Sequence, residues 1–323
     1  MDTKLINRIE QFKDKKILVI GDVMLDKYIW GGVSRISPEA PVQVVNVSKE
    51  SYAPGGAANV ANNIAALNAN VFLVGIVGND SAKDMLITEL KKRNIDVDGI
   101  CIDNSKPTIQ KVRVLGRNQQ LLRFDYEKKG YTDNKIESNI LDFIEGKLDD
   151  IDAIIISDYA KGIITKNLME KLVKLCSNKD KIIVVDPKPK HKEFYNNVTL
   201  ITPNHTEAHQ MTSEFEENSN EEKTGKLLIE ELQSNVLITR GEKGMSLFEK
   251  NGEITHIPTF AKEVYDIVGA GDTSVATLTL ALASGASYEE AAIIANHAAG
   301  ITVGKIGTST VNIEELKKSI ENG

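Results

Sequence analysis

The most constraining feature of this sequence is an alternation of short apolar segments with amphipathic ones. The segments that have the aliphatic or β-branched content of buried strands are 16–21, 71–74, 153–156, 182–185, 200–201 and 236–238. The stretches with helical periodicity between them include 80–93, 135–148, 165–176 and 220–232. This order predicts an α/β fold with a doubly wound, mostly parallel sheet flanked by helices. Ligands of such sheets bind at the carboxyl ends of the strands.

Two segments interrupt this alternation. Residues 28–48 and 108–124 mix β-formers without an intervening helix. We expect them to form a small second sheet, a β lid drawn from about residues 28–50 and 106–125. Such a flap suits an enzyme that must exclude water from its reaction, and a pair of surface hairpins is the alternative.

Composition excludes several classes of partner. The formal net charge of −7 argues against nucleic acid and against an anionic membrane surface. No apolar run is long enough to span a bilayer, and residues 1–16 lack the apolar core of a signal peptide, so we expect a cytoplasmic protein. Cys101 and Cys176 are too few for a disulfide framework and do not have metal-ligand spacing.

Residues 266–272 read Asp-Ile-Val-Gly-Ala-Gly-Asp at a predicted helix start. Glycines let the backbone approach a ligand closely, and the unpaired N–H groups of a first helical turn attract anions. Asp272 at the mouth of such a pocket could meet a hydroxyl where a phosphoryl group arrives. The segment predicts a phosphotransfer site, and a glycine-rich helix start with a first-turn acid is the alternative.

Acids and glycines follow the first predicted strand. Asp22 and Asp26 could accept hydrogen bonds from sugar hydroxyls, although these residues alone favour a turn stabilised by Asp22. Gly55 and Gly56 open the next helix and allow close approach of a substrate, to which Asn59 offers both a donor and an acceptor. A pair of glycines needed for packing is the competing interpretation.

Two further strand ends each carry an acid and a lysine. Asp158 and Lys161 follow one predicted strand, and Asp186 and Lys188 follow the next. This combination suits an anionic substrate that bears hydroxyl groups. Each pair could be a surface ion pair, but their occurrence on adjacent α/β units favours a site.

The segments after 200–201 and 236–238 have features of a nucleotide site. Asn204 and Glu207 have the spacing of a capping box, and they could also organise Mg²⁺ and its waters near phosphate oxygens. Residues 239–244 could cradle nucleotide phosphates or ribose, or form a glycine turn.

Together these segments resemble the two signatures of the ribokinase-like (PfkB) sugar kinases. Residues 55–59 with Gly78 are similar to the first signature, and 266–272 to the second. The resemblance spans essentially the whole chain and implies one kinase domain over 1–323, a large α/β unit with a small β lid. The stretches that look most similar to the heptose 7-phosphate kinases of this family are 21–26, 34–41, 119–120, 157–162, 186–188 and 298–308.

This resemblance implies an activity. It is ATP-dependent phosphorylation of the anomeric O1 of D-glycero-β-D-manno-heptose 7-phosphate, on the route to ADP-heptose for lipopolysaccharide cores. Alternatives are another sugar, sugar phosphate or nucleoside as acceptor, or an inactive sugar-phosphate sensor, which the intact Asp272 disfavours. Relatives often carry a fused nucleotidyltransferase domain, but the sequence lacks a His-x-Gly-His motif, so we expect adenylyl transfer to reside in another protein.

The resemblance also implies residue roles. Asp272 matches the catalytic base, with Gly269, Ala270 and Gly271 as its anion hole. Sugar-binding positions are matched by Asp26, Gly55, Gly56 and Asn59. The remaining matches are Asn204 and Glu207 for Mg²⁺ through water, and Thr239, Gly241, Gly244, Asn296 and Gly304 for the nucleotide. The lids of the family often pair across a homodimer, and a monovalent cation is left open.

An acceptor with a distal phosphate needs cations in this acidic protein. Lys111, Arg113, Arg117 and Arg123 fall in one lid segment with no acid before Asp125. We expect some of these, or Arg35, Lys161 or Lys188, to hold the sugar phosphate, with a solvated lid face as the alternative. A helix N-terminus stabilises an ionised carboxylate, so we also expect the pKa of Asp272 to rise little.

Overall fold

The computed structural model describes residues 2–116, 119–212, 221–261, 265–305 and 309–323. Among these residues, nine strands form one large sheet, ordered β13-β12-β11-β10-β9-β8-β1-β4-β5. Their bounds are β1 (Lys16–Gly21), β4 (Asn70–Val77), β5 (Asp96–Ile102), β8 (Ala153–Ser157), β9 (Ile182–Asp186), β10 (Leu200–Ile201), β11 (Asn235–Thr239), β12 (Met245–Phe248) and β13 (Ile254–Ile257). Pairing is parallel from β5 to β11 and antiparallel for β12 and β13. The predicted doubly wound, mostly parallel sheet is confirmed.

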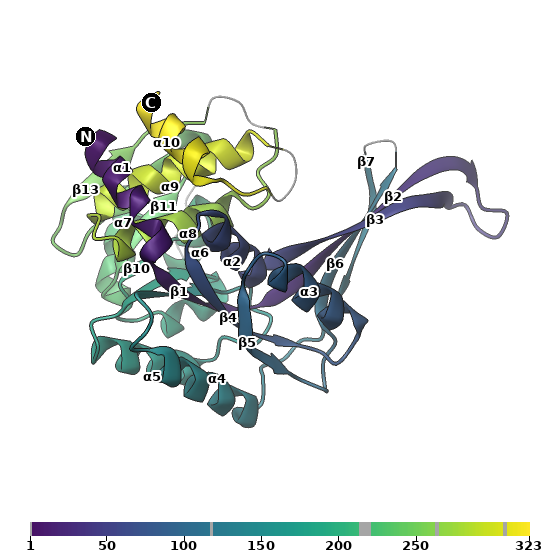
Figure 1. Cartoon of the computed structure of the whole chain (residues 1–323), viewed down its shortest axis with the longest axis horizontal. Helices are drawn as coiled ribbons and strands as arrows, with labels where there is room; N and C mark the ends of the chain where they lie inside the picture. Colours follow the sequence, from purple (N-terminus) through teal and green to yellow (C-terminus); the bar gives the residue numbers. More distant parts are fainter. Residues whose placement is uncertain (1, 117–118, 213–220, 262–264, 306–308) are drawn as a thin grey trace.

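Helices cover both faces of this sheet (Figure 1). One face packs against α1 (Asp2–Glu10), α2 (Ala57–Ala66), α3 (Ser81–Lys91), α8 (Ala270–Ala283), α9 (Tyr288–Val303) and α10 (Ile313–Glu321). The other packs against α4 (Asn134–Lys147), α5 (Lys166–Ser177), α6 (His205–Thr212) and α7 (Glu221–Leu232). Because side chains alternate across a strand, Ile17 and Val19 of β1 enter the first core while Leu18 and Ile20 enter the second. Burial on both faces explains the continuous apolar runs of the sequence.

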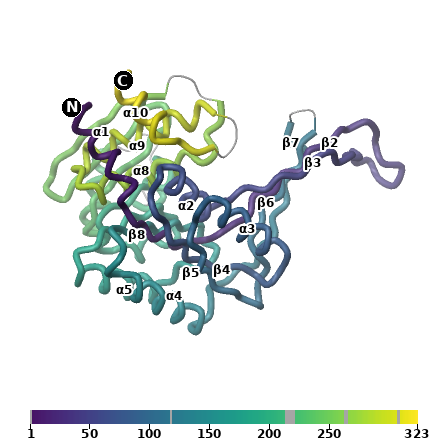
Figure 2. Tube along the Cα trace, viewed as in Figure 1, coloured from purple at the N-terminus to yellow at the C-terminus, as the bar shows by residue number. Residues whose placement is uncertain are grey.

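The predicted lid is a second, four-stranded sheet ordered β3-β2-β6-β7. Its strands are β2 (Val23–Ile36), β3 (Gln43–Gly56), β6 (Ile109–Gly116) and β7 (Gln119–Tyr126). They form an arm that projects from the α/β body (Figures 1 and 2). Strand β2 begins before the predicted lid segment and β3 ends after it. The added residues, Val23 to Leu25 and Pro54 to Gly56, are buried. The root of the lid is therefore part of the core.

None of the helices in the described part of the chain is long and apolar enough to cross a membrane. Cys101 and Cys176 are both free.

Candidate active site

The glycine-rich segment forms the N-terminus of α8. Gly269 caps the helix with φ of 85°, a left-handed conformation that disfavours side chains. A Cβ added to Gly271 would meet nothing within 4 Å, so open space lies in front of the first turn. The N–H of Ala270 donates to the backbone oxygen of Ile267 at 3.3 Å, whereas those of Gly271 and Asp272 have no backbone partner among the described residues and carry the positive partial charge of the helix N-terminus. The local geometry suits an anion.

Asp272 lies in the first turn of α8 and is 7% exposed. Its carboxylate accepts hydrogen bonds from Asn59 Nδ2 at 2.7 Å and from Tyr159 Oη at 2.8 Å. Burial raises its pKa, while these two hydrogen bonds act in the opposite direction. The helix dipole alone predicted little elevation of the Asp272 pKa, but burial of the carboxylate raises it. A raised pKa makes Asp272 a better proton acceptor than an exposed aspartate.

A buried polar chain supports this carboxylate from behind. Asn63 donates to the backbone oxygen of Asn59 at 2.9 Å and accepts from Thr273 Oγ1 at 2.8 Å. Thr302 continues the chain by donating to Thr273 Oγ1 at 3.2 Å. These bonds tie α2, α8 and α9 together around Asp272. Sequence analysis missed Asn63, although its position one helical turn after Asn59 was a usable signal.

The sugar-side residues meet at the root of the lid. Asp26 pairs with Arg113, with 2.6 Å between Oδ1 and Nη1. A Cβ on Gly55 would lie 2.7 Å from Asp26 Oδ2, so the glycine makes room for this carboxylate. Gly56 has φ of 56° and turns the chain into α2. Asn59 Oδ1 is buried without a hydrogen-bond partner among the described residues, which leaves one acceptor for a ligand.

Two residues that were predicted to bind substrate, Asp22 and Asp158, hold the loop after β8 in place. Asp22 accepts hydrogen bonds from the backbone N–H groups of Tyr159 and Lys161 at 2.9 and 3.0 Å, and burial raises its pKa to about 6. Asp158 is fully buried and contacts His191 Nδ1 and Tyr195 Oη, each at 2.6 Å. The turn interpretation of Asp22 fits this geometry. Both carboxylates hold the loop that presents Tyr159.

Tyr159 is the main functional candidate that sequence analysis missed. Its hydroxyl contacts Asp272, and its ring has Lys111 Nζ at 5.3 Å and Lys188 Nζ at 5.5 Å from the centroid. Burial raises the pKa of the phenol well above its usual range, so the hydroxyl stays a donor. Its position between Asp158 and Lys161, which were both predicted as site residues, could have indicated that it belongs to the site.

A cavity of about 180 Å³ lies beside Asp272. The predicted residues that line it are Lys188, Asn204, Glu207, Thr239, Gly269, Gly271 and Asp272. Asp186, which the sequence pairs with Lys188 at a strand end, also lines it, and the lining residues that were not predicted are Tyr159, Thr202 and Ser274. Segments far apart in the sequence therefore converge where the parallel strands end.

Asn204 and Glu207 form the predicted capping box at the start of α6. Glu207 N donates to Asn204 Oδ1 at 2.9 Å, and Asn204 N donates to Glu207 Oε2 at 3.1 Å. The other oxygen of Glu207 pairs with Lys188. Asp186 lines the same cavity, and the described residues give its carboxylate no hydrogen bond or ion pair. Burial and the nearby charge of Asp272 raise its pKa well above the usual range.

The other predicted nucleotide residues do not line this cavity. Gly241 and Gly244 have φ of 58° and 81° in the turn that links β11 to β12. Asn296 donates to the backbone oxygen of Pro258 at 2.6 Å and so joins α9 to the segment after β13. Gly304 follows the end of α9 and is exposed.

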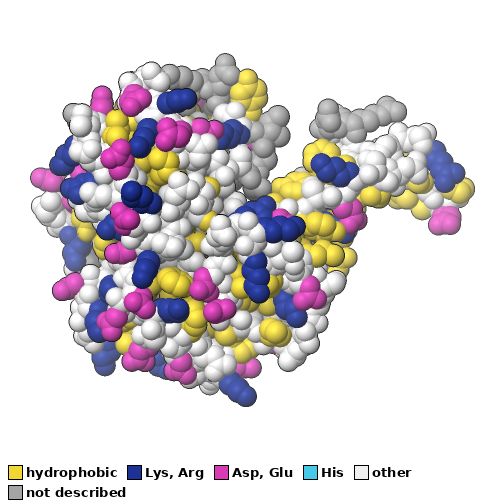
Figure 3. Space-filling model, in the orientation of Figure 1, with side chains coloured by type: hydrophobic (Ala, Val, Ile, Leu, Met, Phe, Trp, Pro, Cys, Tyr) yellow, Lys and Arg dark blue, Asp and Glu magenta, His cyan; other side chains and the backbone are white. Residues whose placement is uncertain are grey.

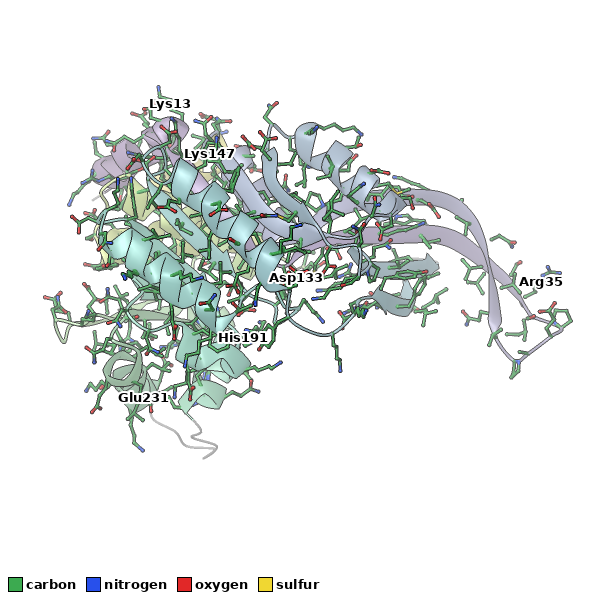
Figure 4. The ribbon with its side chains drawn as sticks, turned by 90° about the horizontal axis from the view of Figure 1, so that it is seen from below. Lys13, Arg35, Asp133, Lys147, His191 and Glu231 are labelled. Atoms are coloured by element: carbon green, nitrogen blue, oxygen red, sulfur yellow. The ribbon has the colours of Figure 1, made fainter. Side chains whose placement is uncertain are left out.

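Four of the predicted phosphate-binding cations are ion-paired. Arg113 pairs with Asp26, Arg123 with Asp125, Lys161 with Glu127 and Lys188 with Glu207. Arg35 lies near the tip of the lid, far from the body (Figure 4). Arg117 lies outside the described residues, as do residues 306–308.

Comparisons with known proteins agree with this architecture. The sequence matches the model of the pfkB family of carbohydrate kinases over residues 14–315. It is 42% identical to the bifunctional protein HldE of Desulfatibacillum aliphaticivorans, covering 100% of this chain and 67% of that protein. It is 44% identical to HldE of Helicobacter pylori, covering 94% and 65%. The chain thus spans about two thirds of the length of these relatives.

Two solved structures are similar in fold. The ribokinase of Thermotoga maritima has a TM-score of 0.73 at 24% identity, with 95% of this chain and 100% of that chain covered. Phosphofructokinase-2 of Escherichia coli has a TM-score of 0.76 at 17% identity, with 95% and 98% covered.

Proposed function

This chain belongs to the pfkB family of carbohydrate kinases, and we propose that it transfers the γ-phosphoryl group of ATP to the anomeric O1 of D-glycero-β-D-manno-heptose 7-phosphate. The product would be the 1,7-bisphosphate on the route to ADP-heptose and lipopolysaccharide cores, and the proposed compartment is the cytoplasm. The observation that carries the reaction type is Asp272 at the start of α8, held by Asn59 and Tyr159. The heptose-kinase-like segments and the identity to HldE proteins support the choice of sugar.

The geometry assigns a role to each wall of the site. Asp272 orients the acceptor hydroxyl and takes its proton as the bond to phosphorus forms. Phosphoryl transfer has a loose transition state, so the proton moves late and a moderately basic carboxylate suffices. The first-turn N–H groups at Gly269 to Gly271 stabilise negative charge on the phosphoryl oxygens. Each such donor is commonly worth about 3–4 kcal/mol.

The cavity residues fit Mg²⁺ held largely through water. Asp186 and Glu207 supply carboxylate oxygens on one wall, and Asn204 supplies an amide oxygen. A cation near Asp186 would relieve the repulsion that raises its pKa. When bound there, Mg²⁺ would neutralise charge on the phosphate oxygens of ATP.

The distal phosphate of the acceptor would bind cations around the lid root. Arg113 and Arg123 occupy neighbouring positions of β6 and β7, and Lys161 lies on the loop that carries Tyr159. Each is paired with a carboxylate, so a phosphate must compete for it. Arginine is well suited to such an exchange because its planar fork binds either anion.

The lid would also mediate a homodimer. Large apolar side chains are exposed on it, namely Trp30, Ile36, Val42, Val47, Leu122, Phe124 and Tyr126. Hydrophobic side chains gather along the arm (Figure 3). Exposed apolar surface of this kind commonly marks an interface. Sedimentation of the wild type and of a Val47→Lys, Leu122→Lys variant would test this, and an unchanged monomer in both would refute it.

A kinase assay across a panel of acceptors tests the proposed reaction. The panel contains the heptose 7-phosphate, heptose, ribose, fructose, fructose 6-phosphate and adenosine, each with ATP and Mg²⁺. We expect the heptose 7-phosphate to give the highest kcat/KM. A better acceptor in the panel would replace the sugar and retain the kinase, whereas binding without turnover of any acceptor would favour a sensor.

A further inference from the structure

One face of the lid is turned toward Asp272. Register pairs Asp26 of β2 with Lys111 of β6, and Lys111 with Asp125 of β7. Two residues farther along, Arg113 is paired with Tyr28 and with Arg123. Paired residues, and residues two apart in a strand, share a face. We call this set the inner lid face.

The charges of the inner lid face do not balance. It has three cations, Lys111, Arg113 and Arg123, and two carboxylates, Asp26 and Asp125. Both carboxylates are taken by the arginines, at 2.6 Å in each case. Within the described residues, Lys111 forms no ion pair or hydrogen bond; its ammonium lies over the ring of Tyr159. It is the unneutralised charge of this face.

Lys111 is half-buried and reaches toward the core. Burial lowers its pKa, and Asp26 is the strongest opposing charge. Lys111 and Lys188 both lie over the Tyr159 ring, 5.3 and 5.5 Å from its centroid, and the Tyr159 hydroxyl contacts Asp272. Lys188 belongs to the nucleotide-side cavity, whereas Lys111 comes from the lid. Two ammonium groups, one from the lid and one from the nucleotide-side cavity, therefore contact the ring whose hydroxyl holds the carboxylate. A half-buried ammonium without an anion is costly unless a ligand supplies one.

We propose that Lys111 binds the phosphoryl group as it passes from ATP to the acceptor, opposite Lys188. This inference rests on the proposed phosphotransfer. The acceptor oxygen forms a bond to the γ-phosphorus, the bond from that phosphorus to the β–γ bridging oxygen breaks, and ADP leaves with that electron pair. Asp272 receives the hydroxyl proton. The ammonium of Lys111 stabilises the negative charge shared by the three phosphoryl oxygens.

The position of Lys111 distinguishes it from the arginines. Strand β6 runs parallel to β2 toward the tip of the lid, so the Cα atom of Arg113 lies about 7 Å farther out than that of Lys111. The guanidinium of Arg113 pairs with Asp26, whereas the ammonium of Lys111 contacts the Tyr159 ring beside Asp272. The arginines can therefore meet the far end of a phosphorylated sugar while Lys111 stays beside the reacting oxygen. The lid then contributes to transfer as well as to exclusion of water.

Steady-state kinetics of Lys111→Met and Lys111→Arg test this assignment. We expect kcat of Lys111→Met to be about 100-fold lower than that of the wild type, with the KM for ATP and for the acceptor each changed less than threefold. The kcat of Lys111→Arg should be at least tenfold higher than that of Lys111→Met. Lys49→Met removes an exposed lysine of the same lid and should leave both parameters unchanged. A loss confined to the KM of the phosphorylated acceptor would overturn the proposal and place Lys111 at the distal phosphate.

The pH profile supplies a readout that a structural role would not change. In the wild type, kcat should fall at alkaline pH as Lys111 loses its proton, below the usual range of lysine. The groups facing Lys111 are Asp26 on β2, Asp125 and Arg123 on β7, Arg113 on β6, and Tyr159 and Asp272 from the core. In Lys111→Arg this limb should move upward, because guanidinium does not titrate there. A limb that stays in place would contradict the assignment.

A binding experiment keeps this proposal separate from the choice of acceptor. Calorimetry without sugar would compare Mg²⁺ complexes of ADP and of the non-hydrolysable analogue AMP-PNP. We expect Lys111→Met to weaken the affinity for AMP-PNP at least threefold and to leave the affinity for ADP unchanged within error. Equal effects on both nucleotides would overturn the proposal, even if the heptose phosphate proved to be the acceptor.

Discussion

The core wall and the lid wall of the candidate site hold their charged groups differently. On the core side, Asp272 is fixed by the uncharged donors Asn59 and Tyr159. On the lid side, Arg113 and Arg123 are held by carboxylates, and the Arg123–Asp125 pair is 44% and 27% exposed. Uncharged donors leave the negative charge of Asp272 available for a proton. The exposed Arg123–Asp125 pair is weak and open to a competing anion, whereas the Arg113–Asp26 pair is largely buried. The core thus positions the reacting group, and the lid exchanges partners with the substrate.

The largest effect should come from Asp272→Asn. We expect kcat to fall about 1,000-fold or more, because the variant keeps the shape and loses the proton acceptor. Nucleotide affinity, measured by calorimetry, should change little. Asp142→Asn, on an exposed position of α4, is the matched control. A residual rate above a tenth of wild type would remove Asp272 from its proposed role.

On the core wall, the Tyr159→Phe variant should have a smaller effect than Asp272→Asn, and it should also have a pH signature. It removes the donor to Asp272 and keeps the aromatic ring that Lys111 and Lys188 both contact. We expect kcat to fall about tenfold. The Tyr159 hydrogen bond lowers the pKa of Asp272, so its loss raises that pKa further. Because the ionised carboxylate is the active form, the acid limb of kcat/KM should shift to higher pH, and an unshifted limb would argue against the contact.

These two residues illustrate what the sequence could reveal. Asp272 was identifiable because its neighbours Gly269 and Gly271 form a contiguous motif with one physical purpose. Tyr159 reaches Asp272 across 113 positions of the chain, and nothing in its local sequence specifies that contact. The fold was predictable for the same reason as Asp272, because strand burial and helix periodicity are local patterns.

The assignments that changed also depended on tertiary context. Asp22 and Asp158 lie at strand ends, as binding residues would, yet their oxygens already have partners. Asp22 accepts from backbone N–H groups of the loop after β8, and Asp158 contacts His191 and Tyr195 from the segment after β9. Elevation of the Asp272 pKa depends on burial between α2 and α8, which a helix start alone does not show. Ion pairing of Arg113 depends on strand register, which places Asp26 of β2 within its reach, whereas Arg123 and Asp125 are two residues apart on β7 and share a face by strand alternation.

The Gly55→Ala variant tests the contact between Gly55 and Asp26 at the root of the lid, where the core wall and the lid wall meet. The added Cβ would lie 2.7 Å from Asp26 Oδ2, so the carboxylate that pairs with Arg113 must shift. We expect KM for the acceptor to rise about tenfold, with a smaller change in kcat, because sugar binding is disturbed more than Asp272. Gly146→Ala, which has open space on α4, is the control. Equal kinetics in the two variants would show that the Asp26 position is unimportant.

The smallest effect is expected at the exposed ion pair of the lid, where Arg123→Ala and Asp125→Ala should act in opposite directions. Removing Arg123 should raise KM for the phosphorylated acceptor about three- to tenfold, because one charge-assisted contact to the phosphate is lost. Removing Asp125 frees Arg123 from its bidentate partner and should lower the same KM. Both effects should shrink at high salt, since the pair is partly exposed.

The unphosphorylated sugar provides the control for this pair of variants. Its KM should be the same in wild type, Arg123→Ala and Asp125→Ala, because no distal phosphate competes for the guanidinium. Parallel changes with both sugars would mean that the variants disturb the lid itself. Unchanged KM values throughout would leave the ion pair as a solvated feature of the lid and assign the phosphate to Arg113 or Lys161.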